Sequence, residues 1–468
     1  MLLLGRIVAA LISGALLAQA YSLNPFWPLA WLAPIPLLIA AIGASRIGAL
    51  AYGAIAGVTS MALMVGYFLQ LGGIVPVLII TLTKAIIWAA MAYAVRGAAQ
   101  LLPKWAAVFV FPSLMAGIDT LIAATSPHGS AGALAYSQMD FLPVIQIASL
   151  GGAPAITFVV TLFASALAIL ITKRALVAAI ASALVIAGAL VFGVTRIPVV
   201  EPEVPSGPPR TLNATLIAGD QFDGIPMEWR TVWNAYTPQI ERAADAGRRI
   251  IVLPEKIAHI PPDERGVAIE QLAEIARRRD MLIVAGVDDE AEDGRFNRAF
   301  AFTRETWESY DKRHMIPGFE SHFDLGTGPL IFEHEGVRYG VAICKDMDFP
   351  ALGREYAGIA VMLVPAWDFV DDAWLHSRMA VLRGVESGYA IARSARNGAL
   401  TVSDAYGRVN YEAPSGPQTA YDVAIPRTGP GPTLYARFGD AFGWSMLALA
   451  ALLIGWTIWA RRRVGAAD

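Results

Sequence analysis

A single cysteine lies at the end of a short apolar run. Cys344 is the only cysteine among 468 residues, and it follows the segment 339–343. The β-branched residues of that segment predict a buried strand, and the polar residues 345–348 predict its exit. A thiol at a strand end can face a cleft, where a nucleophile is needed. The alternative interpretation is an inert cysteine in the core, which is common.

Two further stretches supply the partners that a nucleophilic thiol requires. Glu255 ends the apolar run 250–254, and Lys312 precedes His314 in a Tyr-x-Lys-x-His pattern. A carboxylate among apolar residues can have its pKa raised enough to act as a base. Attack on an acyl carbon creates an oxyanion, which a fixed cation stabilises. Glu255, Lys312 and Cys344 therefore predict a base, a cation and a nucleophile.

The order and approximate spacing of these three residues resemble the Glu-Lys-Cys triad of the nitrilase (carbon–nitrogen hydrolase) superfamily. The resemblance implies that Glu255, Lys312 and Cys344 are catalytic and that their domain is an αββα sandwich. Independently, strands and helices alternate between residues 211 and 425, with added hairpins, which predicts an α/β fold.

The composition predicts a membrane protein. Hydrophobic residues make up 56% of the chain and charged residues only 16%, whereas a soluble domain has about 25% charged residues. Crossing a bilayer takes about 20 apolar residues in a helix. The first apolar run could be a signal peptide, but it lacks a clear cleavage site and leads directly into another run. About eight transmembrane helices are predicted, near 2–20, 27–43, 47–70, 74–95, 105–124, 147–172, 175–195 and 442–460.

Lysine and arginine residues predict the orientation of these spans. Basic loops are retained in the cytoplasm, and all of them fall on one side if the N-terminus is cytoplasmic. The sequence then predicts a transmembrane bundle of seven spans over 1–198. It also predicts an extracytoplasmic catalytic domain over 199–440 and a last span with a basic tail over 441–468. A Pro-rich linker is expected at 199–210.

Two ionisable residues lie inside predicted spans. Lys84 falls near the middle of the fourth span and Asp119 within the fifth. Such residues are costly in lipid and usually face the interior of a helix bundle. They are interpreted either as a polar lining beneath the active site or as a structural pair between neighbouring helices.

The loop 126–138 carries a second resemblance. Its Gly, Ser and Ala residues predict, by themselves, only a flexible loop. However, its Ser-Pro-x-Gly and Leu-x-Tyr-Ser-Gln elements are similar to a loop of apolipoprotein N-acyltransferases, and residues 148–152 fit the same family. This resemblance narrows the superfamily to one membrane branch and covers essentially the whole chain.

The family resemblance implies roles for further residues. Glu320 lies eight residues after Lys312 and is expected to hold that lysine or Glu255 in place, unless it is an exposed loop residue. His314 could be a base, although its position in the pattern indicates a structural hydrogen bond. Supporting roles are implied for Glu320, Lys345, Asp346, Arg383 and Glu386, and substrate-binding roles for Trp367, Tyr136 and His314.

This chain departs from the family directly after the nucleophile. Family members usually carry an aromatic residue and a glutamate there, whereas this chain has Lys345 and Asp346. A lysine beside a thiol favours the thiolate, and its presence removes an aromatic wall that could contact acyl chains. The change therefore concerns the acyl donor and acceptor more than the fold.

The resemblance implies an N-acyltransferase of the bacterial inner membrane, with its catalytic domain on the periplasmic side. An acyl chain would pass from a phospholipid, through a thioester at Cys344, to the α-amine of the lipidated N-terminal cysteine of an apolipoprotein. The expected partners are thus the phospholipid donor, the diacylglyceryl apolipoprotein acceptor and membrane lipids. Acyl transfer of this kind needs no cofactor.

Two alternatives stay open. The first is a related membrane acyltransferase or amidase that acts on a different amine or lipid. The second is an inactive lipid-binding scaffold. A net charge of −3 without a basic stripe does not favour nucleic acid as a partner. Six histidines without HxxxH or HExxH spacing do not favour a metal site.

Overall fold

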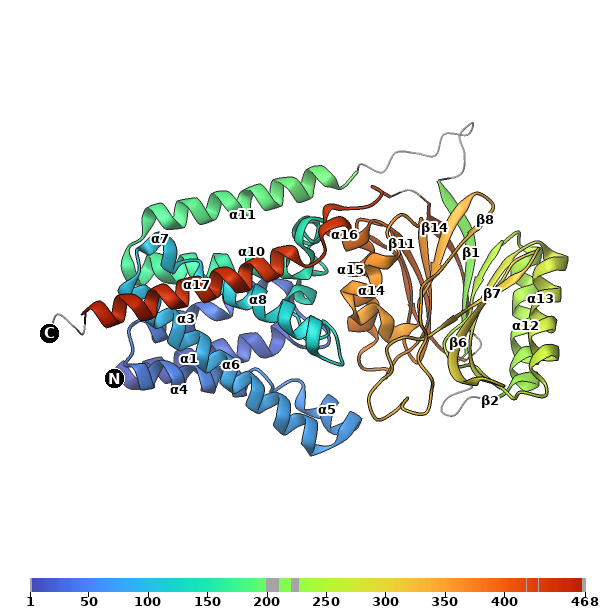
Figure 1. Ribbon diagram of the computed structural model, residues 1–468, viewed down its shortest axis with the longest axis horizontal. Helices are drawn as coiled ribbons and strands as arrows, with labels where there is room; N and C mark the ends of the chain where they lie inside the picture. Colours follow the sequence, from blue (N-terminus) through green and yellow to red (C-terminus); the bar gives the residue numbers. More distant parts are fainter. Residues whose placement is uncertain (1, 199–209, 220–226, 418, 428, 465–468) are drawn as a thin grey trace. The chain divides into compact units, whose positions relative to one another are not determined.

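The computed structural model describes residues 2–198, 210–219, 227–417, 419–427 and 429–464. The chain forms two compact units, one helical and one α/β (Figure 1). The helical unit comprises Met1–Ala124, Gly132–Ile197 and Phe438–Asp468, and the α/β unit comprises Thr125–Ala131 and Pro198–Arg437. The predicted linker at 199–210 lies outside the described residues except for its last residue.

The helical unit consists of long apolar helices. Among the described residues, six helices are long and apolar enough to cross a membrane. The protein is therefore a membrane protein by the length and composition of its helices. They are α1 (Leu2–Ala20), α6 (Ile74–Leu101), α7 with α8 (Lys104–Ala107 and Val110–Thr125), α10 (Ala148–Lys173), α11 (Leu176–Arg196) and α17 (Ala441–Val464).

The other two predicted spans are each divided into shorter helices. The run 27–43 forms α2 (Trp27–Leu32) and α3 (Pro34–Ile42), which meet where Pro34 cannot donate a backbone hydrogen bond. The run 47–70 forms α4 (Arg46–Thr59) and α5 (Val65–Gly72). An apolar run thus sets the length that can enter a membrane, but not where the helix breaks.

The two ionisable residues of the spans have separate partners. Lys84 Nζ lies 3.9 Å from the centroid of the Tyr21 ring, a cation–π contact. Asp119 Oδ2 accepts a hydrogen bond of 2.7 Å from Thr157. Within the part of the chain that the structure describes, no ion pair joins Lys84 to Asp119. The structural pair considered from the sequence is therefore not formed.

The first sheet of the α/β unit runs in the order β14-β1-β3-β5-β4-β2, and β6 joins it through β5 and carries β7. Parallel β1, β3 and β5 form its centre. Helices α12 (Trp229–Asp245) and α13 (Arg265–Arg279) pack on one face through an apolar cluster. The strands are β1 (Thr211–Ala218), β2 (Met227–Glu228), β3 (Ile250–Val252), β4 (Ala258–Ile260), β5 (Leu282–Ala291), β6 (Gly294–Phe302), β7 (Trp307–Asp311) and β14 (Thr419–Pro426).

The second sheet runs in the order β13-β12-β11-β10-β9-β8. Helices α14 (Pro350–Glu355) and α15 (Ala373–Ser387) pack on its outer face. The strands are β8 (Leu330–His334), β9 (Val337–Val341), β10 (Val361–Trp367), β11 (Ala390–Arg396), β12 (Ala399–Ser403) and β13 (Val409–Pro414).

The inner faces of the two sheets share one apolar core. That core contains residues of β1, β3 and β5 together with residues of β9, β10 and β11. Each sheet carries its helices on the opposite face, so the layers are helix, sheet, sheet, helix (Figure 1). The predicted fold, a polytopic helical part plus an αββα sandwich, is confirmed. The elements β2, β4 and α14 are only two to six residues long, and runs of that length give no clear periodicity in the sequence.

Candidate active site

Cys344 lies where the second sheet gives way to a short turn of helix. Strand β9 ends at Val341, and Cys344 begins the 3-10 helix η3 (Cys344–Asp348). Its φ of +42° lies in the left-handed region, which an L residue adopts only when the surrounding structure imposes it. The residue is 5% exposed, and Sγ lies 3.5 Å from the carbonyl oxygen of Trp367.

Glu255, Lys312 and Glu320 form one cluster of buried charges. Lys312 Nζ donates to Glu255 Oε1 at 2.8 Å and to Glu320 Oε2 at 2.7 Å. The lysine follows β7, and Glu255 follows β3. The Glu255 backbone N–H donates to the carbonyl of Ala366 in β10, so a hydrogen bond between the sheets positions the backbone of this residue. Glu320 is buried, and the alternative of an exposed loop glutamate is thereby excluded.

Sequence reasoning missed two members of this cluster. Lys256 donates to Glu320 Oε1 and lies 3.9 Å from Glu255 Oε1. Asn297 of β6 donates to Glu255 at 2.6 Å and to Glu320 at 3.0 Å. The position of Lys256 directly after Glu255 was an available signal, whereas only the pairing of β5 with β6 brings Asn297 to the site. The two lysines and two carboxylates cancel in charge, which limits the cost of burying them.

Burial governs the proton affinities at the site. It raises the pKa of Cys344 well above its usual value, and the negative charge of Glu255 raises it further, while Lys312 opposes the change. Burial alone would lower the pKa of Lys312, but the charges of Glu255 and Glu320 outweigh it and raise that pKa. The lysine is therefore a permanent cation, and the thiol needs a base before it can attack.

Asp346 connects η3 to the segment that carries Lys312. Its carboxylate accepts hydrogen bonds from Tyr310 Oη at 2.8 Å and from the backbone N–H of His314 at 2.9 Å. The imidazole of His314 lies 3.0 Å from the same carboxylate and stacks on Phe349 with ring centroids 3.6 Å apart. The ring of His314 thus contacts both η3 and the residue that follows it.

The ammonium group of Lys345 contacts two polar side chains. Its ammonium lies 3.2 Å from Asp348 Oδ2 and 3.4 Å from His128 Nδ1. His128 belongs to the segment Thr125–Ala131, which the chain contributes to the α/β unit from between two membrane helices. Ser130 of this segment donates to the Asp348 carbonyl through both its backbone N–H, at 2.9 Å, and its hydroxyl, at 2.7 Å. The segment thus covers η3.

Arg383 and Glu386 form a salt bridge within α15 at 2.8 Å. Read as an isolated i,i+3 pair, they would lie on a surface, but both side chains are at most 1% exposed. Arg383 also donates to the Ser130 hydroxyl at 3.3 Å, and the Glu386 carbonyl accepts from Thr433. Through Ser130, the pair therefore contacts the segment that covers η3.

The predicted substrate-binding residues do not all lie in one unit. Trp367 ends β10, and its ring centroid lies 3.4 Å from Arg396 and 5.0 Å from Lys256 Nζ. Tyr136 lies in the helical unit, on the 3-10 helix Leu134–Gln138, and is 2% exposed. The α/β unit thus contains every predicted site residue except Tyr136.

A second group of polar side chains converges on the thiol. One ligand-type atom each of Cys344, Asp368 and His376 lies within 4.8 Å of the other two. Asp368 forms a buried ion pair with Arg393 of β11, and both oxygens take part. His376 of α15 has its Nε2 3.4 Å from Asp372. Sequence reasoning gave neither Asp368 nor His376 a role, because the residues come from separate strand and helix ends.

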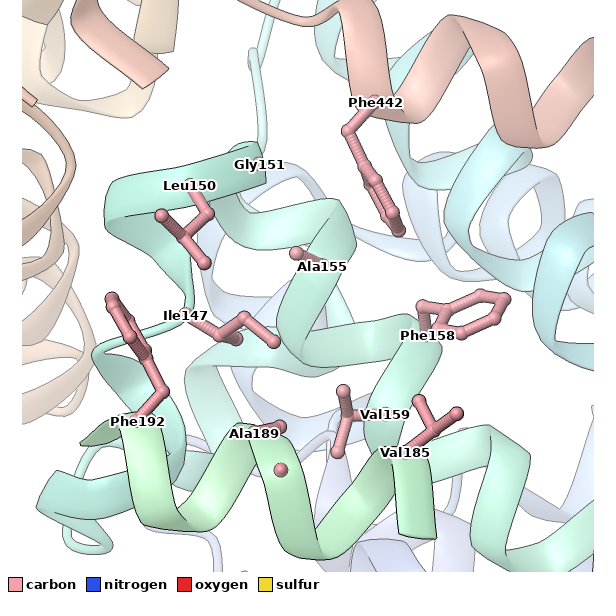
Figure 2. A pocket seen from close by; sticks show the side chains of 11 residues that line it. Ile147, Leu150, Gly151, Ala155, Phe158, Val159, Val185, Ala189, Phe192 and Phe442 are labelled. Carbon is pink, nitrogen blue, oxygen red and sulfur yellow. The ribbon is translucent and has the colours of Figure 1, made fainter. Parts of the chain in front are cut away.

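The helical unit contains an apolar pocket of about 390 Å³ (Figure 2). It lies beside the break in α10 at Gly151 and Gly152, whose backbone angles are not helical. Figure 2 shows Phe158 and Phe442 on one side of the pocket and Phe192 on another. The lining residues from α10, α11 and α17 carry no titratable group, so the pocket offers no group for acyl chemistry.

Two family models match the chain in succession. The model of the apolipoprotein N-acyltransferase N-terminal domain matches residues 13–166, and that of carbon-nitrogen hydrolase matches residues 228–420. The chain is 25% identical to an apolipoprotein N-acyltransferase of Geobacter metallireducens, over 95% of this chain and 94% of that protein. It is 26% identical to the enzyme of the same name from Vibrio parahaemolyticus, over 69% and 70%.

The chain is also similar in fold to solved structures that cover about half of its length. XC1258 from Xanthomonas campestris, a CN-hydrolase superfamily protein, is 20% identical with a TM-score of 0.42, over 51% of this chain and 97% of that one. An amidase from Nesterenkonia sp. is 20% identical with a TM-score of 0.42, over 46% and 90%.

The membrane helices and the hydrolase sandwich together define a membrane-bound carbon–nitrogen hydrolase. The two family models cover the helical part and the sandwich in turn, and the relative from Geobacter metallireducens matches both parts at once. Over most of its length the chain is thus similar to apolipoprotein N-acyltransferases, as its sequence motifs indicated.

Proposed function

We propose that this enzyme transfers an acyl chain from a phospholipid to the α-amine of the lipidated N-terminal cysteine of an apolipoprotein. The observation that carries the proposal is the buried cluster of Glu255, Lys312 and Glu320 in the same unit as Cys344. The relatives that are named apolipoprotein N-acyltransferases support the choice of acceptor.

In the first half-reaction, Cys344 acts as the nucleophile. Because burial keeps the thiol protonated, Glu255 removes its proton as the sulfur attacks the ester carbonyl of the donor. The ammonium of Lys312, fixed by two carboxylates, stabilises the oxyanion without reorganising. Lysophospholipid then leaves with the proton that Glu255 returns, and a thioester remains on Cys344.

In the second half-reaction, the acceptor amine attacks the thioester. The C–N bond forms while the C–S bond breaks, and the Cys344 thiol is restored with a proton from the amine. Glu320, Lys256 and Asn297 serve as positioning residues, because they hold Glu255 and Lys312 but do not touch the reacting atoms.

The proposed location is the bacterial inner membrane, with the α/β unit on the periplasmic side. Arg46 at the start of α4 and Arg461–Arg463 at the end of α17 are among the charges that would face the cytoplasm. This orientation brings the thiol to the side of the membrane where phospholipid donors of the outer leaflet and exported lipoproteins meet.

The experiment uses the full-length protein in mixed micelles with a labelled phospholipid and no acceptor. Intact mass spectrometry should detect an acyl adduct that hydroxylamine removes and that Cys344→Ala lacks. A synthetic peptide with an S-diacylglyceryl cysteine and a free α-amine should then receive the label. If thiol labelling proves that the protein is folded and no adduct forms, the phospholipid donor is ruled out.

A second candidate is a related acyltransferase or amidase that acts on a different amine or lipid. The specific observation that favours it is Lys345, which forms an ion pair with Asp348 where the family has an aromatic side chain. Under this alternative the adduct still forms from phospholipid, but the diacylglyceryl peptide does not discharge it. Comparison with lipids and amines that lack the diacylglyceryl group then identifies the acceptor.

A further inference from the structure

Cys344, Asp368 and His376 present three acceptor-type atoms to one point. Since these atoms lie within 4.8 Å of one another, a point exists within about 2.8 Å of all three, a hydrogen-bond distance. An atom slightly out of their plane therefore contacts the sulfur, the carboxylate and the imidazole together. The point adjoins the sulfur that would carry the acyl group.

The chemistry of the trio fits a primary ammonium. Such a group has three N–H donors and no acceptor, and the trio offers acceptors from a carboxylate, an imidazole and a sulfur. A divalent transition metal fits less well, because Arg393 already occupies both oxygens of Asp368 and the Lys312 cation acts on the same thiol. Arg393 also fixes the orientation of the carboxylate.

His376 is placed to take a proton from that ammonium. Its side chain is 19% exposed, whereas Asp372, 3.4 Å from Nε2, is fully buried. The Asp372 carboxylate thus lies against the ring and orients it. Glu255 has less freedom for this task, since its Oε1 already accepts from Lys312 and Asn297.

We propose that Asp368 and His376 form the acceptor-amine subsite of the enzyme. This inference rests on the function proposed above and adds a second base to it. The ammonium gives one proton to His376, and the neutral amine attacks the thioester carbon. As the C–N bond forms and the C–S bond breaks, the second proton passes through Glu255 to the leaving thiolate. The imidazolium then releases its proton to water.

The test separates the two half-reactions of the full-length protein. The variant His376→Gln is acylated with labelled phospholipid, and the adduct is then exposed to the S-diacylglyceryl cysteine peptide. Acylation should proceed at the wild-type rate, while transfer to the peptide should slow by about 10²-fold or more, as expected for loss of a general base. His259→Gln, a substitution on β4 that leaves the trio intact, is the matched control.

Hydroxylamine provides an internal control, because it is uncharged at neutral pH and needs no base. It should discharge the adduct of His376→Gln and of the wild type equally fast. Added imidazole should restore peptide transfer in His376→Ala. Two results for His376→Gln would contradict the proposed subsite. One is a loss of acylation as large as the loss of transfer, and the other is transfer at the wild-type rate. Failure of the wild type to form an adduct would instead reject the proposed function.

Discussion

At the scale of single residues, Glu320 is shared by two lysines. Burial would raise its pKa, but Lys312 and Lys256 lower it, so the group stays ionised at neutral pH. Without this carboxylate, the cluster holds two lysines and only Glu255. The neutral balance of the buried charges would be lost.

We therefore expect Glu320→Gln to destabilise the α/β unit. Breaking a buried ion pair costs about 3–5 kcal/mol, and each kcal/mol lowers the melting temperature of a domain of this size by roughly 2–4 °C. Thermal unfolding should show a decrease of about 6–20 °C, together with a loss of acylation. Glu308→Gln, an exposed substitution on β7, should change neither quantity. An unchanged melting temperature for Glu320→Gln would contradict the role of the cluster.

The reactivity of Cys344 should depend on pH in a characteristic way. Because burial raises the pKa of the thiol, the thiolate fraction is small at neutral pH and still increases at pH values where an ordinary thiol is fully ionised. Alkylation by iodoacetamide should therefore keep accelerating above pH 9, whereas N-acetylcysteine levels off. Mass spectrometry of the protein, which has no other cysteine, measures the rate directly. A plateau near neutral pH would mean that the thiol is already ionised.

The sequence predicted most of the charged residues of the site but not all of their partners. Glu255, Lys312, Glu320 and Cys344 were found because each belongs to a short motif with a recognisable chemistry. Asn297 could not be found, since its contact depends on the register of β5 and β6, in which it lies opposite Asp288. That register is a property of tertiary pairing and has no signal in the local sequence.

At the scale of elements, Gly286 of β5 packs directly against the residues that follow β3. A Cβ on Gly286 would lie 2.6 Å from the Pro254 carbonyl oxygen and 2.7 Å from Glu255 Cα. Gly286 also exchanges backbone hydrogen bonds with Pro254 and Ile257. A displacement of β5 at Gly286 would therefore also move Glu255, the proposed base.

Gly286→Ala should thus reduce activity through the position of Glu255. Overpacking of this kind costs about 1–3 kcal/mol, and the displaced carboxylate should lower the rate of acylation more than the affinity for phospholipid. Gly266→Ala in α13, where nothing lies within 4 Å of the new Cβ, is the control and should retain full activity. Equal rates for the two variants would show that the strand end tolerates the displacement.

At the scale of the whole molecule, the single cysteine makes the orientation of the chain testable. In the Cys344→Ala background, a cysteine can replace the exposed residue Glu308 of the α/β unit or Arg46 at the start of α4. In bacterial spheroplasts, an impermeant maleimide should label the first and should label the second only after lysis. Labelling of Arg46→Cys in intact spheroplasts would reverse the proposed topology.

The architecture as a whole was predictable because it depends on long-range averages. Apolar runs of about 20 residues and alternating strands and helices are robust signals. The predicted division near residue 198 lies within one residue of the division in the structure, but the second piece of the α/β unit was not foreseen. The segment Thr125–Ala131 was predicted as a loop of the membrane part, but it is a piece of the α/β unit, held there by Ser130 and Arg383.

That short segment has a consequence for how the protein can be dissected or can evolve. Because the α/β unit is assembled from Thr125–Ala131 and Pro198–Arg437, the chain passes between the units four times. A gene fragment that encodes only the longer piece omits the cover of η3. Transfer of the intact α/β unit to another membrane anchor would therefore require both pieces of the chain.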